Sequence, residues 1–95
     1  MMGRLNRVFA RRVSAIEIEE MSRRVGRAEA APEARGLSLV CESVGPVRVV
    51  DWLHWSVWRD RDSGQIWVRC TGGVAGVDAW YGPADASVAG KLVEE

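Results

Sequence analysis

The sequence predicts an α+β domain in which an N-terminal helical segment, of one or two helices, precedes a four- to five-stranded antiparallel sheet and a weak C-terminal helix. Two observations predict this class. Apolar residues recur at helical spacing in the first third of the chain, and from residue 37 onward β-branched, aromatic and glycine residues dominate. The 95 residues fit one domain, with a basic helical segment over 1–35 and a tryptophan-rich antiparallel sheet over 36–95.

The helical segment carries two apolar stripes on nearly opposite sides. The first consists of Leu5, Val8, Phe9, Val13 and Ile16, and the second of Ile18, Met21, Val25 and Ala28. A capping box, in which Ser14 caps the N–H of Glu17, would break the segment into a short basic helix over 4–12 and a longer one over 15–30. Favourable i,i+4 pairs support the second helix: Glu19–Arg23 and Glu20–Arg24. The alternative is one long helix that uses its two stripes against different surfaces.

The second part of the chain has the residue composition of a meander of antiparallel strands. The expected strands span residues 37–42, 47–51, 53–60, 65–70 and 77–81, and the terminal helix spans 84–93. Val44 to Pro46 and Gly82–Pro83 are expected to form turns, and the glycine-rich 71–76 a loop. The strands at 53–60 and 65–70 are expected to form a hairpin with the four-residue loop 61–64.

The register of this hairpin separates its side chains into two sets, because successive residues of a strand point to opposite faces. A four-residue loop places Trp58 opposite Trp67 and Val57 opposite Val68. One face is then wholly apolar and should be the core, covered by the N-terminal helix: Leu53, Trp55, Val57, Ile66, Val68 and Cys70. The other face is mixed: Trp52, His54, Ser56, Trp58, Trp67 and Arg69. A three-residue loop would mix the two sets.

The mixed face allows three interpretations. The C-terminal segment or the short basic helix covers it, so that it forms a second core. Alternatively, it binds another protein or a second copy of this chain, because tryptophan and arginine dominate interface hot spots. In the third interpretation it is a nucleic-acid platform, on which bases stack while arginines hold phosphates. The arginines available for that role are Arg4, Arg7, Arg11 and Arg12.

Charge and composition restrict these choices. Residues 1–35 hold eight arginines against five glutamates, a net charge of +3, whereas residues 36–95 carry −3, so the chain as a whole is neutral. A basic segment on an acidic body can steer an anionic partner or drive self-association. The hydrophobic fraction of 47% indicates a folded chain, and no apolar run is long enough to span a membrane. We therefore expect no membrane partner.

Catalytic and metal-binding motifs are weak. Cys41 with His54, oriented by Asp51, is the one combination suited to thiol chemistry, but a buried cysteine is the simpler interpretation. One histidine and no paired cysteine motif predict no metal, and no nucleotide-binding glycine motif points to a cofactor. No secretion signal is visible, so we expect a cytoplasmic protein in which Cys41 and Cys70 are reduced.

The sequence thus predicts a small non-enzymatic interaction or inhibitory protein. Its partner-binding residues are expected to be Trp52, His54, Trp58, Trp67 and Arg69. The alternative function is nucleic-acid binding by the N-terminal arginines and the same tryptophan face. A helix followed by a tryptophan-rich meander with a D-x-x-S-G turn resembles small accessory proteins of bacteria and their phages, and this resemblance implies no particular activity.

Overall fold

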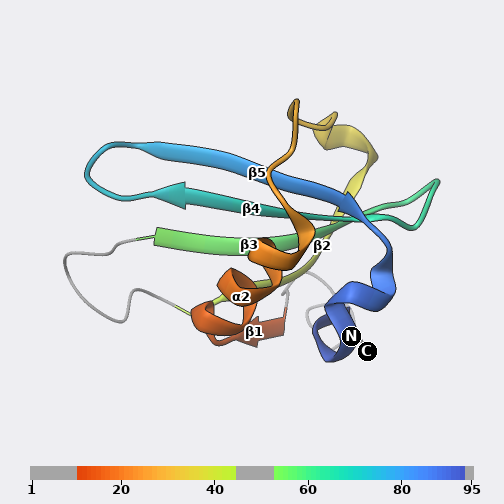
Figure 1. Ribbon diagram of the computed structural model, residues 1–95, viewed down its shortest axis with the longest axis horizontal. Coiled ribbons are helices and arrows are strands. Elements are labelled where there is room, and N and C mark those ends of the chain that lie inside the picture. Colours follow the sequence, from red (N-terminus) through yellow and green to blue (C-terminus); the bar gives the residue numbers. More distant parts are fainter. Residues whose placement is uncertain (1–10, 45–52, 94–95) are drawn as a thin grey trace, which may run out of the picture.

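The computed structural model describes residues 11–44 and 53–93 (Figure 1). Along the chain, its elements are β1 (Arg11–Val13), α2 (Ala15–Val25), η1 (Ala34–Gly36), β2 (Leu37–Ser43), β3 (Leu53–Asp60), β4 (Ile66–Gly72), β5 (Val77–Ala84) and η2 (Ala86–Val93). The strands form one sheet in the order β1-β2-β3-β4-β5, in which β1 runs parallel to β2 and all other neighbours are antiparallel. The α+β class is as predicted, but the sheet is mixed rather than antiparallel.

The predicted short helix over 4–12 is wrong where the structure describes it. Residues 11–13 are extended and pair with β2, with Arg11 opposite Cys41 and Val13 opposite Ser43. Val13 turns toward the core while the two arginines stay exposed. Pairing satisfies the backbone groups along the edge of β2, and this tertiary interaction overrides the helical pattern of the side chains. The remainder of that helix, the strand over 47–51 and most of the turn at 44–46 lie outside the described residues.

Helix α2 begins where the capping pattern predicts. The Ser14 hydroxyl accepts a hydrogen bond from the backbone N–H of Ile16 at 3.3 Å, and the N–H of Glu17 donates to the Ser14 carbonyl instead of to its side chain. The Glu19–Arg23 ion pair is confirmed, with a distance of 3.0 Å. Ile18 and Met21 are fully buried, so the second apolar stripe faces the core.

The helix ends at Val25, earlier than the predicted residue 30, because the chain turns at Gly26 to follow the outer edge of β5. Gly26 has a φ of +88°. Beyond it, the N–H of Ala28 donates to the Trp80 carbonyl and the N–H of Gly82 donates to the Gly26 carbonyl, both at 2.9 Å. Residues 26–28 thereby cover part of an edge that would otherwise present unpaired backbone groups.

The β3–β4 hairpin has the predicted register. Trp58 pairs with Trp67 and Val57 with Val68 across a loop that closes with a hydrogen bond from the Asp60 N–H to the Gln65 carbonyl at 2.8 Å. The apolar face is buried as expected, at Trp55, Val57, Ile66, Val68 and Cys70. It packs against Ile18 and Met21 of α2 and against Ala89 and Leu92 of η2, so both helices lie on one side of the sheet.

The C-terminal part departs from prediction in two respects. Strand β5 continues through Gly82–Pro83 to Ala84 rather than ending at residue 81. The terminal helix consists of two short 3₁₀ turns separated at Gly90, which has a φ of +52° and a ψ of −123°. Glycine in a helix interior carries a conformational penalty, so the chain kinks there. Leu92 nevertheless reaches the core.

Gly82 of β5 lies close to the backbone of β4. A Cβ atom at this position would lie 2.9 Å from the carbonyl oxygen of Ile66 and 3.4 Å from the Cα of Trp67, and the φ of Gly82 is +123°. Both the space and the backbone conformation therefore require glycine.

We expect Gly82→Ala to lower the free energy of unfolding by about 2 kcal/mol or more, because the new methyl group meets backbone atoms in a strained conformation. The matched control is Gly36→Ala, where a Cβ would have no atom within 4 Å and the φ is not positive. That change should stay within about 0.5 kcal/mol of the original chain. Urea unfolding of both variants checks this, and equal stabilities would contradict it.

Candidate binding surface

Three tryptophans gather on the side of the sheet opposite α2 and η2. Pairing places Leu39 beside Trp58 and Trp58 beside Trp67, and it places Ser56 beside Arg69 and Arg69 beside Trp80. Directly paired residues share a face, so these side chains all lie opposite the core. We refer to this set as the tryptophan surface: Leu39, Ser56, Trp58, Trp67, Arg69, Asp78 and Trp80. Its three indoles are neither fully buried nor fully exposed.

Trp80 is the centre of this surface. Its ring centroid lies 6.4 Å from that of Trp58 and 6.5 Å from that of Trp67, with interplanar angles of 53° and 86°. The sequence pattern predicts a direct Trp58–Trp67 pair, but the ring contacts of both residues run through Trp80. Such tilted and edge-to-face arrangements are favoured by the quadrupole of aromatic rings. The cluster is therefore a single connected stack.

Arg69 contacts both the ring of Trp80 and the carboxylate of Asp78. Its guanidinium carbon lies 5.1 Å from the centroid of the Trp80 ring, a distance typical of a cation–π contact. Its Nε and one terminal nitrogen also donate to the two carboxylate oxygens of Asp78 at 3.0 and 2.9 Å. This bidentate hydrogen bond lowers the pKa of Asp78 and raises the pKa of Arg69 relative to their ordinary values. The arginine charge is thus already paired.

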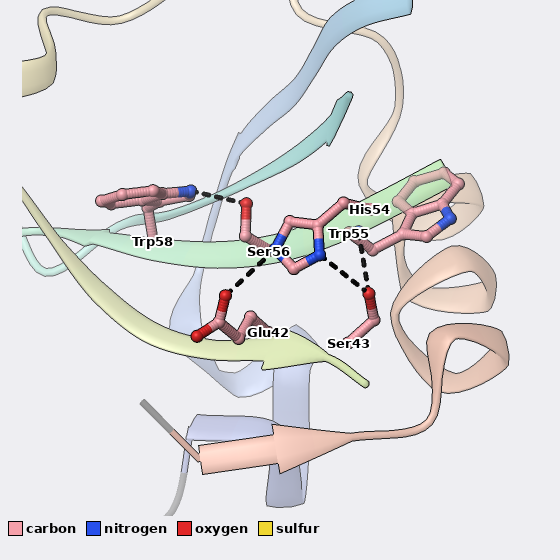
Figure 2. Close-up of polar contacts among 6 residues, drawn as sticks. All are labelled: Glu42, Ser43, His54, Trp55, Ser56 and Trp58. Atoms are coloured by element: carbon pink, nitrogen blue, oxygen red, sulfur yellow. Dashed lines mark hydrogen bonds and ion pairs between the residues drawn. The ribbon is translucent and has the colours of Figure 1, made fainter. Parts of the chain in front are cut away.

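His54 belongs to a polar rim rather than to the ring stack. Figure 2 shows its imidazole between two side chains of β2, with Nε2 3.0 Å from a carboxylate oxygen of Glu42 and Nδ1 3.5 Å from the Ser43 hydroxyl. The same hydroxyl accepts the backbone N–H of Trp55 at 3.0 Å, and Ser43 is only 3% exposed. A buried serine that is engaged in this way ties β2 to β3 and is poorly placed to act as a nucleophile.

The indole of Trp58 is fixed by a neighbour on its own strand. Figure 2 shows its Nε1 donating to the Ser56 hydroxyl, and the distance is 2.9 Å. Ser56 is 5% exposed. A ring whose polar group already has a partner has few alternative positions, so this part of the surface is preorganised.

A pocket adjoins the tryptophan surface at the edge of β5. It has a volume of about 450 Å³ and lies between the chain that follows α2 and the end of β5, and its lining consists of Arg27, Glu29, Ala30, Trp67, Gly82 and Pro83. Arg27 also stacks over Tyr81, at 5.9 Å from the ring centroid. Because Trp67 lines the pocket and also contacts Trp80, the pocket and the surface are continuous.

The structure does not unite all the residues that the sequence singles out. Trp58, Trp67 and Arg69 come together, and His54 lies on the same face of β3 beside them. Arg11 and Arg12 lie on β1, at the opposite edge of the sheet from β5. Three candidates fall outside the described residues: Trp52, Arg4 and Arg7.

Trp80 and the pocket are what sequence reasoning missed. Trp80 and Tyr81 are adjacent, so strand alternation requires one of them to face the core, and the sequence alone does not say which. The structure decides it through the ion pair between Asp78 and Arg69, since residues 78 and 80 share a face. The pocket depends on the non-helical path of residues 27–30, and the sequence predicts these residues to be part of a helix.

Cys41 does not have the environment of a reactive thiol. It is fully buried on the core face, whereas His54 lies on the other face of the sheet. Burial raises the pKa of Cys41 from 9.0 to about 11, so the thiol stays protonated at neutral pH. Cys41 and Cys70 are both free and buried, as predicted. The third member of the proposed thiol site, Asp51, lies outside the described residues.

No protein-family model, curated protein or solved structure matches this chain. Within the described ranges, no three His, Cys, Asp or Glu side chains gather where they could hold a metal ion. Nor does any helix in that part of the chain combine the length and the apolar character needed to cross a membrane. The arrangement of the tryptophan surface itself is therefore the basis for a functional hypothesis.

The raised pKa of Cys41 predicts a loss of stability in alkali. Above pH 9 the unfolded thiol ionises while the folded thiol remains protonated up to about 11, so the free energy of unfolding should fall as pH rises through this window, by at most about 1.4 kcal/mol per pH unit. Denaturant titrations of the original chain and of Cys41→Ala between pH 8 and pH 11 measure the effect. The variant should show a shallower decline, and identical slopes would contradict the assignment to Cys41.

Proposed function

We propose that this chain is a non-enzymatic interaction or inhibitory protein that binds another protein through the tryptophan surface. The observation that carries this proposal is the position of three partly exposed indoles on the face that α2 and η2 leave uncovered in the described structure. Tryptophan and arginine are the residue types that contribute most to protein interfaces. Leu39, which is 37% exposed, extends the apolar area next to Trp58.

The preorganised state of the surface favours binding. Trp58 is hydrogen-bonded to Ser56, and Trp80 lies between two other indoles and the Arg69 guanidinium. Side chains that are already ordered in the free protein lose little rotamer entropy on association. The paired charges of Arg69 and Asp78 would form part of the polar rim that surrounds an apolar centre.

A second copy of the chain is one form that the partner can take. A two-fold dimer would place the same surface of both copies in contact, because a two-fold interface is self-complementary. The partner is therefore either a different protein or a second copy of the chain, and the mass of the isolated species in solution distinguishes the two.

Nucleic-acid binding is the weaker candidate. Phosphate binding requires free cations near the stacking rings. Arg69 is committed to Asp78, and Glu42 and Asp78 add negative charge to the same face. Arg27 lines the adjoining pocket, but Glu29 lines it as well. Arg11 and Arg12 lie at the far edge of the sheet, separated from Trp80 by three intervening strands.

Truncation of the indoles should abolish partner capture. We expect Trp58→Ala with Trp67→Ala to weaken binding by about 30-fold or more, since loss of one hot-spot residue typically costs about 2 kcal/mol. The assay is affinity capture from the native host with the tagged full chain, followed by measurement of the affinity for the identified protein. Ile16→Ala, at a 61% exposed apolar site on α2, is the matched control and should bind normally.

A further variant distinguishes a loss of binding from an unfolding of the double mutant. Leu39→Arg leaves all three rings in place and adds charge and bulk to the surface, so it should also lose the partner while its unfolding curve remains close to that of the original chain. If both surface variants capture the partner as well as Ile16→Ala does, the tryptophan surface is not the binding site.

The charge arrangement predicts weak affinity for nucleic acids. Single-stranded oligonucleotides should show no electrophoretic shift with the full chain even at low ionic strength, where phosphate contacts are strongest. A shift that disappears as salt is added would support the nucleic-acid alternative.

A further inference from the structure

The three indoles of the tryptophan surface differ in their polar groups. Trp58 donates its N–H to Ser56. Among the described residues, the indole nitrogens of Trp67 and Trp80 have no hydrogen-bond acceptor. No buried side-chain nitrogen or oxygen in the same part of the chain lacks a partner, so these two N–H groups must be accessible to solvent. The surface therefore presents two open donors beside apolar ring faces.

The pocket next to Trp67 extends this surface. Its lining combines the Trp67 ring with Pro83 and the backbone at Gly82, and its volume of about 450 Å³ is in the range that accommodates a ligand group. Trp67 contacts Trp80 in an edge-to-face arrangement, so a ligand that crosses Trp67 would meet the ring stack first and the pocket next. This arrangement suits an extended ligand better than a compact one.

We propose that the tryptophan surface and the adjoining pocket bind a proline-rich segment in the polyproline II conformation. This inference rests on the proposed function and names the class of partner. Polyproline II segments have no internal hydrogen bonds, so their carbonyl groups are free to accept from indole N–H donors. Their proline rings pack on flat aromatic side chains, which is the usual way in which such segments dock in aromatic-lined grooves. Trp67 and Trp80 supply both interactions.

Other ligand conformations fit the two open donors less well. The carbonyl groups of an α-helix are already bonded within the helix, apart from its last turn. An added β-strand would pair along a sheet edge and not across a face. On β5, part of that edge is occupied, because the Trp80 carbonyl and the Gly82 N–H bond to residues 26–28. A nucleic acid would need cations for its phosphates, whereas Arg69 is paired with Asp78 and Arg27 lines the pocket together with the acidic Glu29.

The test is selection of random peptides, each of about 12 residues and long enough for several polyproline turns, from a phage-displayed library against the full chain. Enriched peptides should contain repeated prolines well above the library frequency. For a synthetic peptide of the enriched sequence, Trp67→Phe and Trp80→Phe should each weaken binding by about two- to tenfold, because each removes one hydrogen-bond donor and keeps an aromatic ring. Ile16→Ala, at an exposed apolar site on α2 outside the tryptophan surface, is the control and should change the affinity less than twofold.

Two results would overturn the inference. One is that no peptide is enriched, or that proline occurs among the enriched peptides at its library frequency. The other is that Trp67→Phe and Trp80→Phe bind the enriched peptide as tightly as Ile16→Ala does, which would show that the open N–H groups play no part in binding. If a host protein without a proline-rich segment is nevertheless captured, and the Trp58→Ala, Trp67→Ala variant loses it, then this inference fails while the proposed function stands. If that variant retains the host partner, the proposed function fails as well.

Discussion

The register of the β3–β4 hairpin is the constraint on which the rest of the structure depends. The loop over 61–64 sets Trp58 opposite Trp67, and strand alternation then assigns every side chain of both strands to a face. A shift by one residue would mix the two sets, so that either Val57 or Val68 would turn away from the helices while Trp58 or Trp67 would turn toward them. Since both valines are fully buried, such a slip would be strongly unfavourable. Burial on one face therefore enforces the exposure of tryptophans on the other.

The two faces of the sheet are shielded from water in different ways. On the core face, Ile18 and Met21 of α2 and the turns of η2 exclude water from the strands. On the other face, the indoles cover one another, and Trp80 contacts both Trp58 and Trp67. An aromatic cluster of this kind shields the sheet only in part, because each ring keeps some exposed area. The face is thus stable in the free protein and still has apolar surface to bury against a partner.

The sequence predicts those parts of the fold that depend on local chemistry. The hairpin register follows from a turn signal and from the agreement of two apolar sets, and the start of α2 follows from the cap at Ser14. It does not predict features that depend on pairing between distant segments. Residues 11–13 form a strand only because β2 offers them an edge, and α2 stops at Val25 because residues 26–28 pair with β5. Neither partner edge can be recognised from the local pattern.

The same distinction explains what was missed in the candidate site. Trp58, Trp67 and Arg69 share a hairpin whose register the loop determines, so their proximity could be inferred. Trp80 joins them only through the β4–β5 pairing, in which Thr71 lies opposite Asp78 and Arg69 opposite Trp80. That pairing brings Arg69 into contact with both Asp78 and the Trp80 ring, which neutralises the one cation of the stack. The long-range pairing therefore determines both the size of the aromatic cluster and its charge, and a nearly neutral cluster with two open indole donors is better suited to an uncharged extended chain than to a polyanion.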